Sequence, residues 1–486
     1  MHLGYRLRRA ASLDRCLMIS ATIVCALSFA IAPQQSLESL ISKVDKERAI
    51  TVSVMVEKLD GEVLFEYEAD RSMVLASNTK MFTTAAALIE LGEAYRWSTK
   101  VYTKGNDVAI VGGGDPSIGK FNDKDLAQLF VTDLLQSLRS EGVIKIENLY
   151  IDGSLFSEQR HLLWPLEHVE DSFCAPPVAL SVNSSCIDVS YKGYGPIFYP
   201  SIEGSIAVEI YDKPADFLSA WFTDNGAKIW VRLPRIVEST VARYAVPDGI
   251  QFFGWWMQDE LRAAGIEVKQ LVLQAKPEWL EQDLLLDYSS ASSLGEMIVE
   301  INKESNNFVA EMVLKTLGVH QSQTGSYKGG VAAVQAILGE HIDGIEGFSQ
   351  LDGSGLARSS RENNSASPAL ICDLLREMCF LPQGVAWFDS LPIGGVDGTI
   401  ASRFKDEVFQ PQRIRAKTGF IYSTQSEDGR GASSLSGYLL LPDNEIAVFS
   451  FVVNFYRKVN ANSNNRRFKS LRQQFLKQLI QEYRNE

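Results

Sequence analysis

The chain has 486 residues, of which 45% are hydrophobic and 22% are charged, an ordinary globular composition with room for more than one domain. Its formal net charge of −13 and its pI near 5.1 argue against a nucleic-acid partner, because contacts to phosphates need a basic surface. The five histidines show no metal-ligand spacing, so the sequence implies neither a metal nor another cofactor.

The N-terminus has the pattern of an export signal. Four arginines precede an apolar run over residues 16–32: Arg6, Arg8, Arg9 and Arg15. The run is shorter than the about 20 residues that a membrane-spanning helix needs, and Ala30-Ile31-Ala32 offers a small-x-small cleavage site. We therefore expect residues 1–32 to be a signal peptide, cleaved after Ala32 or Ala30. The mature protein should be periplasmic, either free or loosely associated with a membrane.

Four cysteines follow the export segment. In an exported protein Cys174 could pair with Cys186 and close a short loop. Cys372 and Cys379 lie seven positions apart in a helical stretch, about 10 Å of rise, which is too far for a disulfide in a regular helix. We expect this second pair to be buried thiols.

Strand and helix patterns at the two ends of the chain predict a single sheet. Residues 50–67 alternate as two strands around a turn, and residues 434–454 form a second hairpin that follows the strand carrying Lys417. The last stretch, residues 466–483, has apolar side chains at helical spacing and should lie on that sheet. These features predict an α/β (α+β) fold, with an antiparallel sheet flanked by helices.

The middle of the chain is rich in short strand-like runs. Residues 252–256 should form the buried side of a helix that continues to Ala264.

Residues 114–120 imitate a phosphate loop. However, Phe121 stands where a Ser or Thr is required and we expect no parallel βαβ unit around it, so we exclude ATP binding.

Ser77 and Lys80 lie three positions apart at the start of a predicted helix that ends near Gly92. This spacing puts both side chains on one helix face, and free backbone N–H groups at a helix start can stabilise an oxyanion. A buried lysine with a favoured neutral form can take a proton from a serine. Taken alone, the pattern fits equally a helix N-cap beside a surface lysine.

Two more motifs follow in order, Ser305-Asn306-Asn307 and Lys417-Thr418-Gly419. The set S-x-x-K, S-x-N and K-T-G is typical of penicillin-recognising serine acyltransferases. More narrowly, the chain resembles the class C low-molecular-mass penicillin-binding proteins, the D-alanyl-D-alanine carboxypeptidase/endopeptidase family. Four further segments carry this narrower resemblance: residues 112–116 (GGGDP), 352–356 (DGSGL), 391–399 (LPIGGVDGT) and 434–438 (SLSGY).

The resemblance implies a β-lactamase/transpeptidase-like catalytic domain that is discontinuous in sequence, made of residues 33–96 and 286–486. Residues 97–285 would form one or two β-rich inserted domains after the first catalytic helix. The separation of Ser77 from Ser305, 228 residues, is long enough for such an insertion.

The resemblance also implies a mechanism. Ser77 would attack the carbonyl between two D-alanines and form an acyl-enzyme, with Lys80 as the base. Lys417 would hold down the pKa of that base and attract the substrate's terminal carboxylate. Ser305 would relay a proton to the leaving amine, and Asn307 would hydrogen-bond the substrate's amide backbone.

Further substrate contacts are implied around the K-T-G motif. Thr418 and Gly419 belong to the motif itself, Thr418 would touch the carboxylate, and the oxyanion would lie between the backbone N–H groups of Ser77 and Phe420. Asp152 and Arg358 match the positions with which the family recognises the diaminopimelate side chain.

The chain departs from the family at several places. Phe420 replaces the usual Ser or Thr after K-T-G and cannot donate a hydrogen bond to the carboxylate, which weakens the case for efficient carboxypeptidase action and leaves endopeptidase cleavage of cross-links more open. Ser360 replaces an Asn that usually follows Arg358, and the loop over residues 422–432 is long.

Three functions remain open from the sequence. The first is a serine D,D-peptidase acting on peptidoglycan stem peptides or on D-Ala-diaminopimelate cross-links, with β-lactams as inhibitors. The second is a catalytically weak protein that binds or senses muropeptides. The third, a serine β-lactamase, is disfavoured because no clear deacylating Glu is found. The sequence does not indicate an oligomeric state.

Overall fold

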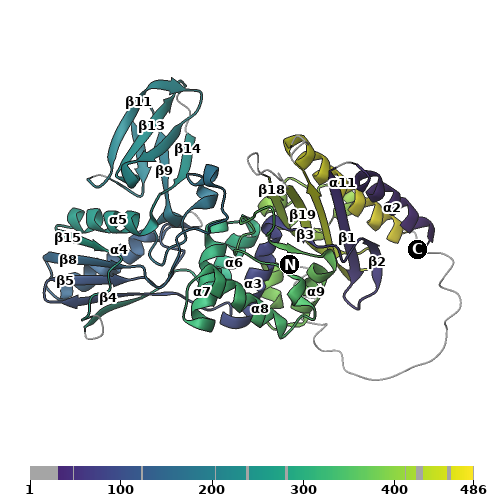
Figure 1. Cartoon of the computed structure of the whole chain (residues 1–486), viewed down its shortest axis with the longest axis horizontal. Helices are drawn as coiled ribbons and strands as arrows, with labels where there is room; N and C mark the ends of the chain where they lie inside the picture. The colour runs from purple at the N-terminus through teal and green to yellow at the C-terminus, as the bar shows by residue number, and fades with distance from the viewer. Residues whose placement is uncertain are drawn as a thin grey trace. The chain divides into compact units, whose positions relative to one another are not determined.

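The computed structural model describes most of the chain after the export segment and divides it into two compact units (Figure 1). The described residues are 31–484 except 48, 122–123, 203, 237–239, 280–282, 411, 423–430 and 457–460. Residues 1–30 of the predicted signal peptide and most of the predicted long loop therefore lie outside them. No helix in the described part of the chain has the length and apolarity that crossing a membrane requires.

The first unit comprises residues up to 93, 298–305 and 334–486, and the second comprises residues 94–297 and 306–333. Residues 286–297 and 306–333, which we predicted to belong to the catalytic domain, thus group with the second unit.

A five-stranded antiparallel sheet forms the centre of the first unit. Its strands, in spatial order, are β18 (Ile414–Ile421), β19 (Gly431–Leu440), β20 (Ile446–Phe455), β1 (Ile50–Lys58) and β2 (Val63–Tyr67). Both predicted hairpins are confirmed, and strands from the two ends of the chain meet where β20 pairs with β1. Strand β18, which carries the K-T-G motif, is an edge of the sheet.

Helices cover both faces of this sheet (Figure 1). Helices α2 (Ile31–Asp45) and α11 (Ala461–Tyr483) share one hydrophobic core with it, and α11 contributes the apolar positions predicted from its spacing. On the opposite face lies α9 (Pro368–Phe380), where the Tyr438 hydroxyl of β19 donates to the Leu375 carbonyl at 2.7 Å. Because both faces are covered, β19 is buried along almost its whole length.

The other elements of the first unit are short. They are β3 (Met73–Val74) paired with β17 (Ser365–Ala366), the 3₁₀ turns η1 (Ala76–Asn78), η6 (Ile345–Gly347), η7 (Gly398–Ile400) and η8 (Glu407–Phe409), and helices α3 (Thr79–Leu91) and α10 (Gly384–Ser390). Helices α6 (Leu294–Lys303) and α8 (Tyr327–Gly339) are divided between the two units.

The second unit contains a mixed five-stranded sheet and two three-stranded sheets. The five strands are β15 (Glu267–Leu273), β8 (Lys145–Asp152), β5 (Asp107–Val111), β4 (Ser98–Lys104) and β16 (Leu284–Ser289). The smaller sheets are β10 (Pro196–Tyr199), β9 (Cys186–Tyr191) and β14 (Thr240–Ala245), and β11 (Ala207–Ala215), β13 (Lys228–Pro234) and β12 (Ser219–Thr223). The remaining elements are α4 (Ala127–Ser140), α5 (Gly249–Ala263), α7 (Asn307–Ser322), β6 (Lys120–Phe121), β7 (Lys124–Asp125), η2 (Leu166–His168), η3 (Ser172–Cys174), η4 (Asn183–Ser185) and η5 (Asp224–Gly226).

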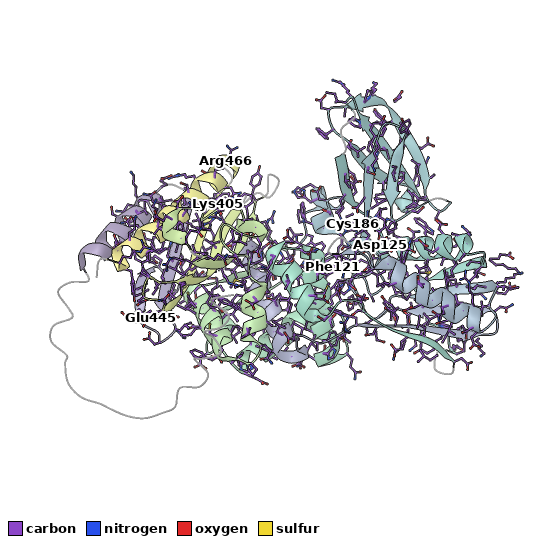
Figure 2. The ribbon with its side chains drawn as sticks, turned by 180° about the vertical axis from the view of Figure 1, so that it is seen from behind. Phe121, Asp125, Cys186, Lys405, Glu445 and Arg466 are labelled. Atoms are coloured by element: carbon purple, nitrogen blue, oxygen red, sulfur yellow. The ribbon has the colours of Figure 1, made fainter. Side chains whose placement is uncertain are left out.

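Strand β5, helix α4 and strand β8 form a parallel βαβ unit, so our expectation that none surrounds residues 114–120 was wrong. The unit forms because α4 buries one side, including Phe130 and Leu134, in the core of this sheet. The segment is nevertheless unsuited to phosphates, since Lys120 lies in β6 and α4 begins only at Ala127. Figure 2 labels Phe121, the other residue of β6.

The helix predicted to run from residue 252 to Ala264 is confirmed as α5, which begins at Gly249 and in which Phe252, Phe253 and Trp256 are buried. The possible disulfide between Cys174 and Cys186 is not confirmed. Both cysteines are buried and form no disulfide (Figure 2 labels Cys186). Burial raises the pKa of the Cys186 thiol to about 11, which keeps the reactive thiolate scarce. Cys372 and Cys379 share α9 and form no disulfide, as the helical spacing predicted; Cys372 is buried as expected, but Cys379 is only partly buried.

Candidate active site

Ser77 lies in the turn η1, directly before helix α3, and Lys80 lies in the first turn of that helix. The Lys80 ammonium donates to the Ser77 hydroxyl at 2.9 Å and to the Ser354 carbonyl at 3.0 Å. Lys80 is completely buried. The first motif is therefore not a capped helix with a surface lysine, because its lysine lies inside the protein in contact with its serine.

The D-G-S-G-L segment packs against the turn that carries Ser77. Gly355 has a φ of +84°, and a Cβ placed there would lie 2.8 Å from the Thr79 hydroxyl. The Asp352 carboxylate holds the loop in shape, since it accepts from the backbone N–H of Gly355 at 2.8 Å and of Ala357 at 2.6 Å. A glycine that allows close approach and a carboxylate that orders the backbone thus position the carbonyl that Lys80 contacts.

Strand β18 brings a second lysine and a second serine to the site. The Lys417 ammonium donates to the Ser305 hydroxyl at 2.8 Å and to the Thr418 carbonyl at 3.0 Å. Burial, together with the charge of Lys80, holds the pKa of Lys417 well below its usual range. Two buried amines therefore lie close enough to repel each other, and each contacts one serine hydroxyl.

The L-P-I-G-G-V-D-G-T segment connects Ser305 to that strand. Lys303, two residues before Ser305, is ion-paired with Asp397. The same segment reaches β18, where the Ala416 N–H donates to the Pro392 carbonyl at 3.0 Å. Ser305 itself has a φ of 61°, a left-handed conformation that is uncommon outside glycine.

The edge of the sheet packs directly against the turn that holds the nucleophile. A Cβ placed on Gly419 would lie 2.6 Å from the Leu75 carbonyl and 3.1 Å from the Ser77 backbone nitrogen. From β19, the Ser434 hydroxyl donates to the Leu75 carbonyl at 2.8 Å, and Asn78 donates to the Ser436 hydroxyl at 2.7 Å. The sequence marked the segment around Ser434 as a point of resemblance, but only the structure shows that it anchors this turn.

Thr418 and Phe420 lie on the other side of β18 from Lys417. The Thr418 hydroxyl donates to the Thr399 hydroxyl at 2.9 Å, which brings the end of the L-P-I-G-G-V-D-G-T segment beside the K-T-G motif. Phe420 is 38% exposed, and its ring is stacked 6.3 Å from that of Phe455. Arg358 is half-buried, and its guanidinium donates to the carbonyls of Leu356 and Tyr422, both at 3.4 Å.

Asn307 and Asp152 belong to the second unit. Asn307 begins α7, and its amide donates to the Phe173 carbonyl at 3.0 Å. Asp152 ends β8 as a buried residue, and its carboxylate accepts from the Ser154 N–H at 2.9 Å. The structure therefore brings Ser77, Lys80, Ser305 and Lys417 together within one unit, while these two residues have separate local settings.

The G-G-G-D-P segment also has a structural setting in the second unit. A Cβ on Gly112 would lie 2.5 Å from the Ala179 carbonyl, so close backbone packing requires this glycine. Asp115 is buried and accepts from the Ser117 N–H at 2.8 Å, and burial raises its pKa to about 6.

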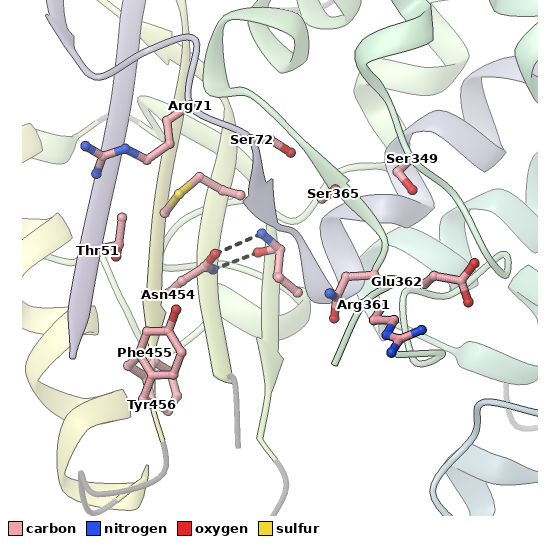
Figure 3. A pocket seen from close by; sticks show the side chains of 13 residues that line it. Thr51, Arg71, Ser72, Ser349, Arg361, Glu362, Ser365, Asn454, Phe455 and Tyr456 are labelled. Carbon is pink, nitrogen blue, oxygen red and sulfur yellow. Dashed lines mark hydrogen bonds between the residues drawn. The ribbon is translucent and has the colours of Figure 1, made fainter. Parts of the chain in front are cut away.

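A polar hollow of about 360 Å³ lies along β3 of the first unit (Figure 3). The Asn454 side chain bridges β20 to β3 beside it, accepting from the Val74 N–H at 2.9 Å and donating to the Val74 carbonyl at 3.0 Å. None of the predicted site residues lines this hollow. In the described part of the chain, no group of three or more metal-ligating side chains is present.

Comparison with known proteins assigns the chain to a family. A model of the D-Ala-D-Ala carboxypeptidase 3 (S13) family matches residues 33–475. The chain belongs to this family. It is 27% identical over 464 residues to a D-alanyl-D-alanine carboxypeptidase of Actinomadura sp. (strain R39), covering 87% of this chain and 80% of the relative. It is 24% identical to the D-alanyl-D-alanine carboxypeptidase DacB of Haemophilus influenzae, covering 84% of this chain and 86% of the relative.

The fold is that of a solved penicillin-binding protein. The crystal structure of penicillin binding protein 4 (dacB) from Haemophilus influenzae matches with a TM-score of 0.73 at 22% identity, over 92% of this chain and 98% of that chain. The predicted resemblance and the predicted fold class are confirmed. The S13 chain is a serine-type D-Ala-D-Ala carboxypeptidase, a hydrolase.

Proposed function

We propose that this S13 protein cleaves peptidoglycan stem peptides through an acyl-enzyme on Ser77. The observation that carries the proposal is the pair of contacts from two buried amines to two hydroxyls, Lys80 to Ser77 at 2.9 Å and Lys417 to Ser305 at 2.8 Å. A serine in contact with a buried amine is an activated nucleophile. A second amine close to the first favours one neutral amine in the pair, which can then accept a proton.

In the acylation step the Ser77 hydroxyl oxygen bonds to the carbonyl carbon between two D-alanines. Lys80 takes the hydroxyl proton, the C–N bond breaks, and Ser305 passes a proton to the leaving amine. The oxyanion is stabilised by the N–H groups of Ser77 and Phe420, and this is supported by the close packing of Gly419 on the Ser77 turn. Water then hydrolyses the ester and restores the serine.

Other side chains bind the substrate in this proposal. Asn307 holds the amide backbone, and Lys417 with Thr418 attracts the terminal carboxylate. Asp152 and Arg358 bind the diaminopimelate side chain. Phe420 offers no hydroxyl to the carboxylate of a leaving D-alanine, which weakens carboxypeptidase action and leaves cleavage of cross-linked peptides as the favoured alternative.

We further propose the organisation and location predicted from the sequence. Residues 1–32 direct export to the periplasm, residues 33–96 and 286–486 form the catalytic domain, and residues 97–285 are inserted. A solved complex supports binding of the wider ligand class: the crystal structure of the Haemophilus influenzae protein complexed with a β-lactam matches this chain with a TM-score of 0.69. Stem peptides and β-lactams are therefore the proposed ligands.

A fluorescent penicillin separates the candidate functions. Stable labelling of the purified protein that disappears in Ser77→Ala supports the acyl-enzyme. Absence of labelling supports a muropeptide-binding protein without efficient catalysis, and rapid turnover of the label supports a β-lactamase.

The two peptidase activities need a second assay. Release of D-alanine from a pentapeptide measures carboxypeptidase action, and cleavage of a cross-linked muropeptide dimer measures endopeptidase action. The proposal expects the dimer to be the faster substrate. A protein that releases D-alanine much faster than it cleaves the dimer would contradict the role given to Phe420.

A further inference from the structure

Arg472 occupies a core position on helix α11. The buried stripe of this helix runs through Phe468, Phe475 and Leu476 and packs on the main sheet, and Arg472 lies within it at 1% exposure. A guanidinium in an apolar stripe breaks the pattern that forms the rest of the helix. Such exceptions generally need a partner for the buried charge.

The protein supplies that partner only in part. Arg472 donates through Nη2 to the Ser433 hydroxyl at 2.9 Å. Its Nε and Nη1 atoms are buried and have no hydrogen-bond partner among the described residues. Arginine carries five N–H donors and cannot lose its charge at physiological pH, so most of its hydrogen-bonding capacity is unmet.

A second arginine, Arg403, lies near it; this residue is half-buried, and its guanidinium is 4.7 Å from the centre of the Phe404 ring. Arg403 donates through Nη2 to the carbonyl of Lys469, at 3.4 Å, one helical turn before Arg472. Its Nη1 is also buried without a partner in the described part of the chain. Burial and the charge of Arg403 hold the pKa of Arg472 well below its usual range, which agrees with two like charges in proximity.

No carboxylate among the described residues is ion-paired or hydrogen-bonded to Arg403, Lys469 or Arg472. Buried like charges without a counter-ion are strongly unfavourable. We infer that Arg403 and Arg472 bind a small anion behind strand β19. This ligand is a halide or a small oxyanion such as phosphate or a carboxylate, and it completes the hydrogen bonding of both guanidinium groups.

The site lies on the opposite face of the sheet from the two catalytic serines. Ser433, which Arg472 holds, pairs across the β18–β19 ladder with Phe420, the residue after K-T-G. An anion at Arg472 therefore stabilises the docking of α11 on the strand next to K-T-G, without touching the peptidase chemistry.

Thermal unfolding of the full chain at constant ionic strength tests the site. Sodium chloride, bromide, phosphate and acetate are each exchanged against a large organic sulfonate. The wild type should show a saturable rise in Tm with at least one small anion, and the ranking of the four separates halide from oxyanion. Arg472→Met and Arg403→Met should each lose that rise. Arg466→Met, an exposed arginine on the same helix (Figure 2), should keep it.

Two variants are used because Arg472→Met alone could fail to fold. Anomalous scattering from crystals grown in bromide gives the direct test, with a peak expected within hydrogen-bonding distance of Arg472 Nε. A wild-type Tm that is insensitive to anion identity, or density there that fits only water, overturns the inference.

Discussion

Lys417 and Lys315 are both completely buried, one in each unit of the chain, and the groups around them differ. Lys417 contacts the Ser305 hydroxyl and lies near a second ammonium, that of Lys80. Lys315 contacts the carbonyls of Glu158 and Pro177 and lies 4.6 Å from the centre of the Tyr327 ring.

Burial lowers the pKa of Lys315 to about 8, so both lysines are poor cations inside the protein. Of these two lysines, only Lys417 lies beside a serine hydroxyl and a second amine, whereas Lys315 contacts carbonyl oxygens and aromatic rings and interacts with the carboxylates of Glu158 and Glu311. A buried lysine with a lowered pKa is therefore not in itself a catalytic feature. What distinguishes the first unit is the meeting of a nucleophile, a base and a second amine.

The largest expected effect is on acylation. Lys80→Met should lower the rate of labelling by a fluorescent penicillin by about 10²–10⁴-fold, the usual contribution of a general base. Lys315→Met, which also removes a buried lysine, should leave that rate near the wild-type value. Equal losses in the two variants would contradict the distinction between the two regions.

The free energy of unfolding should depend on Lys315, although the labelling rate does not. Because Lys315 has a pKa near 8 when folded and near 10.5 when unfolded, the unfolded chain binds more protons between these values. The penalty of charging Lys315 is complete below pH 8 and is relieved as the pH rises toward 10.5. We expect Lys315→Met to remove a pH-dependent difference of about 3 kcal/mol in the free energy of unfolding. Denaturant titrations of both proteins from pH 7 to 10.5 would measure it, and parallel pH profiles would contradict it.

Gly419 tests how closely the sheet edge packs on the nucleophile. Gly419→Ala places a Cβ 2.6 Å from the Leu75 carbonyl, so it should destabilise the first unit or displace the Ser77 turn, at a cost of about 1–3 kcal/mol. Gly347→Ala is the matched control, because its added Cβ would meet only Leu370, at 3.7 Å. Tm and labelling rate together measure the effect, and identical behaviour of the two variants would show that the packing is loose.

The smallest effect concerns substrate choice. Phe420→Ser restores a hydroxyl after K-T-G and should raise D-alanine release relative to dimer cleavage by about tenfold, the value of one hydrogen bond to a charged group. Phe380→Ser removes a phenylalanine that is 62% exposed on α9 and should leave the ratio unchanged. An unchanged ratio of D-alanine release to dimer cleavage in Phe420→Ser would show that Phe420 does not set the preference between these two substrates.

Local patterns predicted the elements of both units better than their connections. The hairpin over residues 50–67 and the final helix follow from period-two and helical spacing, which are properties of neighbouring residues. The parallel pairing of β5 with β8 was missed because strand partners are decided by packing against α4. Spacing and export left a Cys174–Cys186 disulfide open, because whether two cysteines pair depends on geometry that the sequence does not show.

The motifs predicted which residues meet but not what holds them. Ser77 and Lys80 were readable from spacing, and their meeting with Ser305 and Lys417 followed from the resemblance. The supports from Gly355 and Ser434 are long-range contacts of short, glycine- or serine-rich segments, for which the sequence has no periodic signal.

Mass spectrometry of the penicillin-treated protein tests the central claim most directly. The account predicts an increase by one penicillin, carried by the peptide that contains Ser77, and no increase in Ser77→Ala. An adduct on Ser305 or another residue, or a Ser77→Ala protein that is acylated as readily as the wild type, would contradict it.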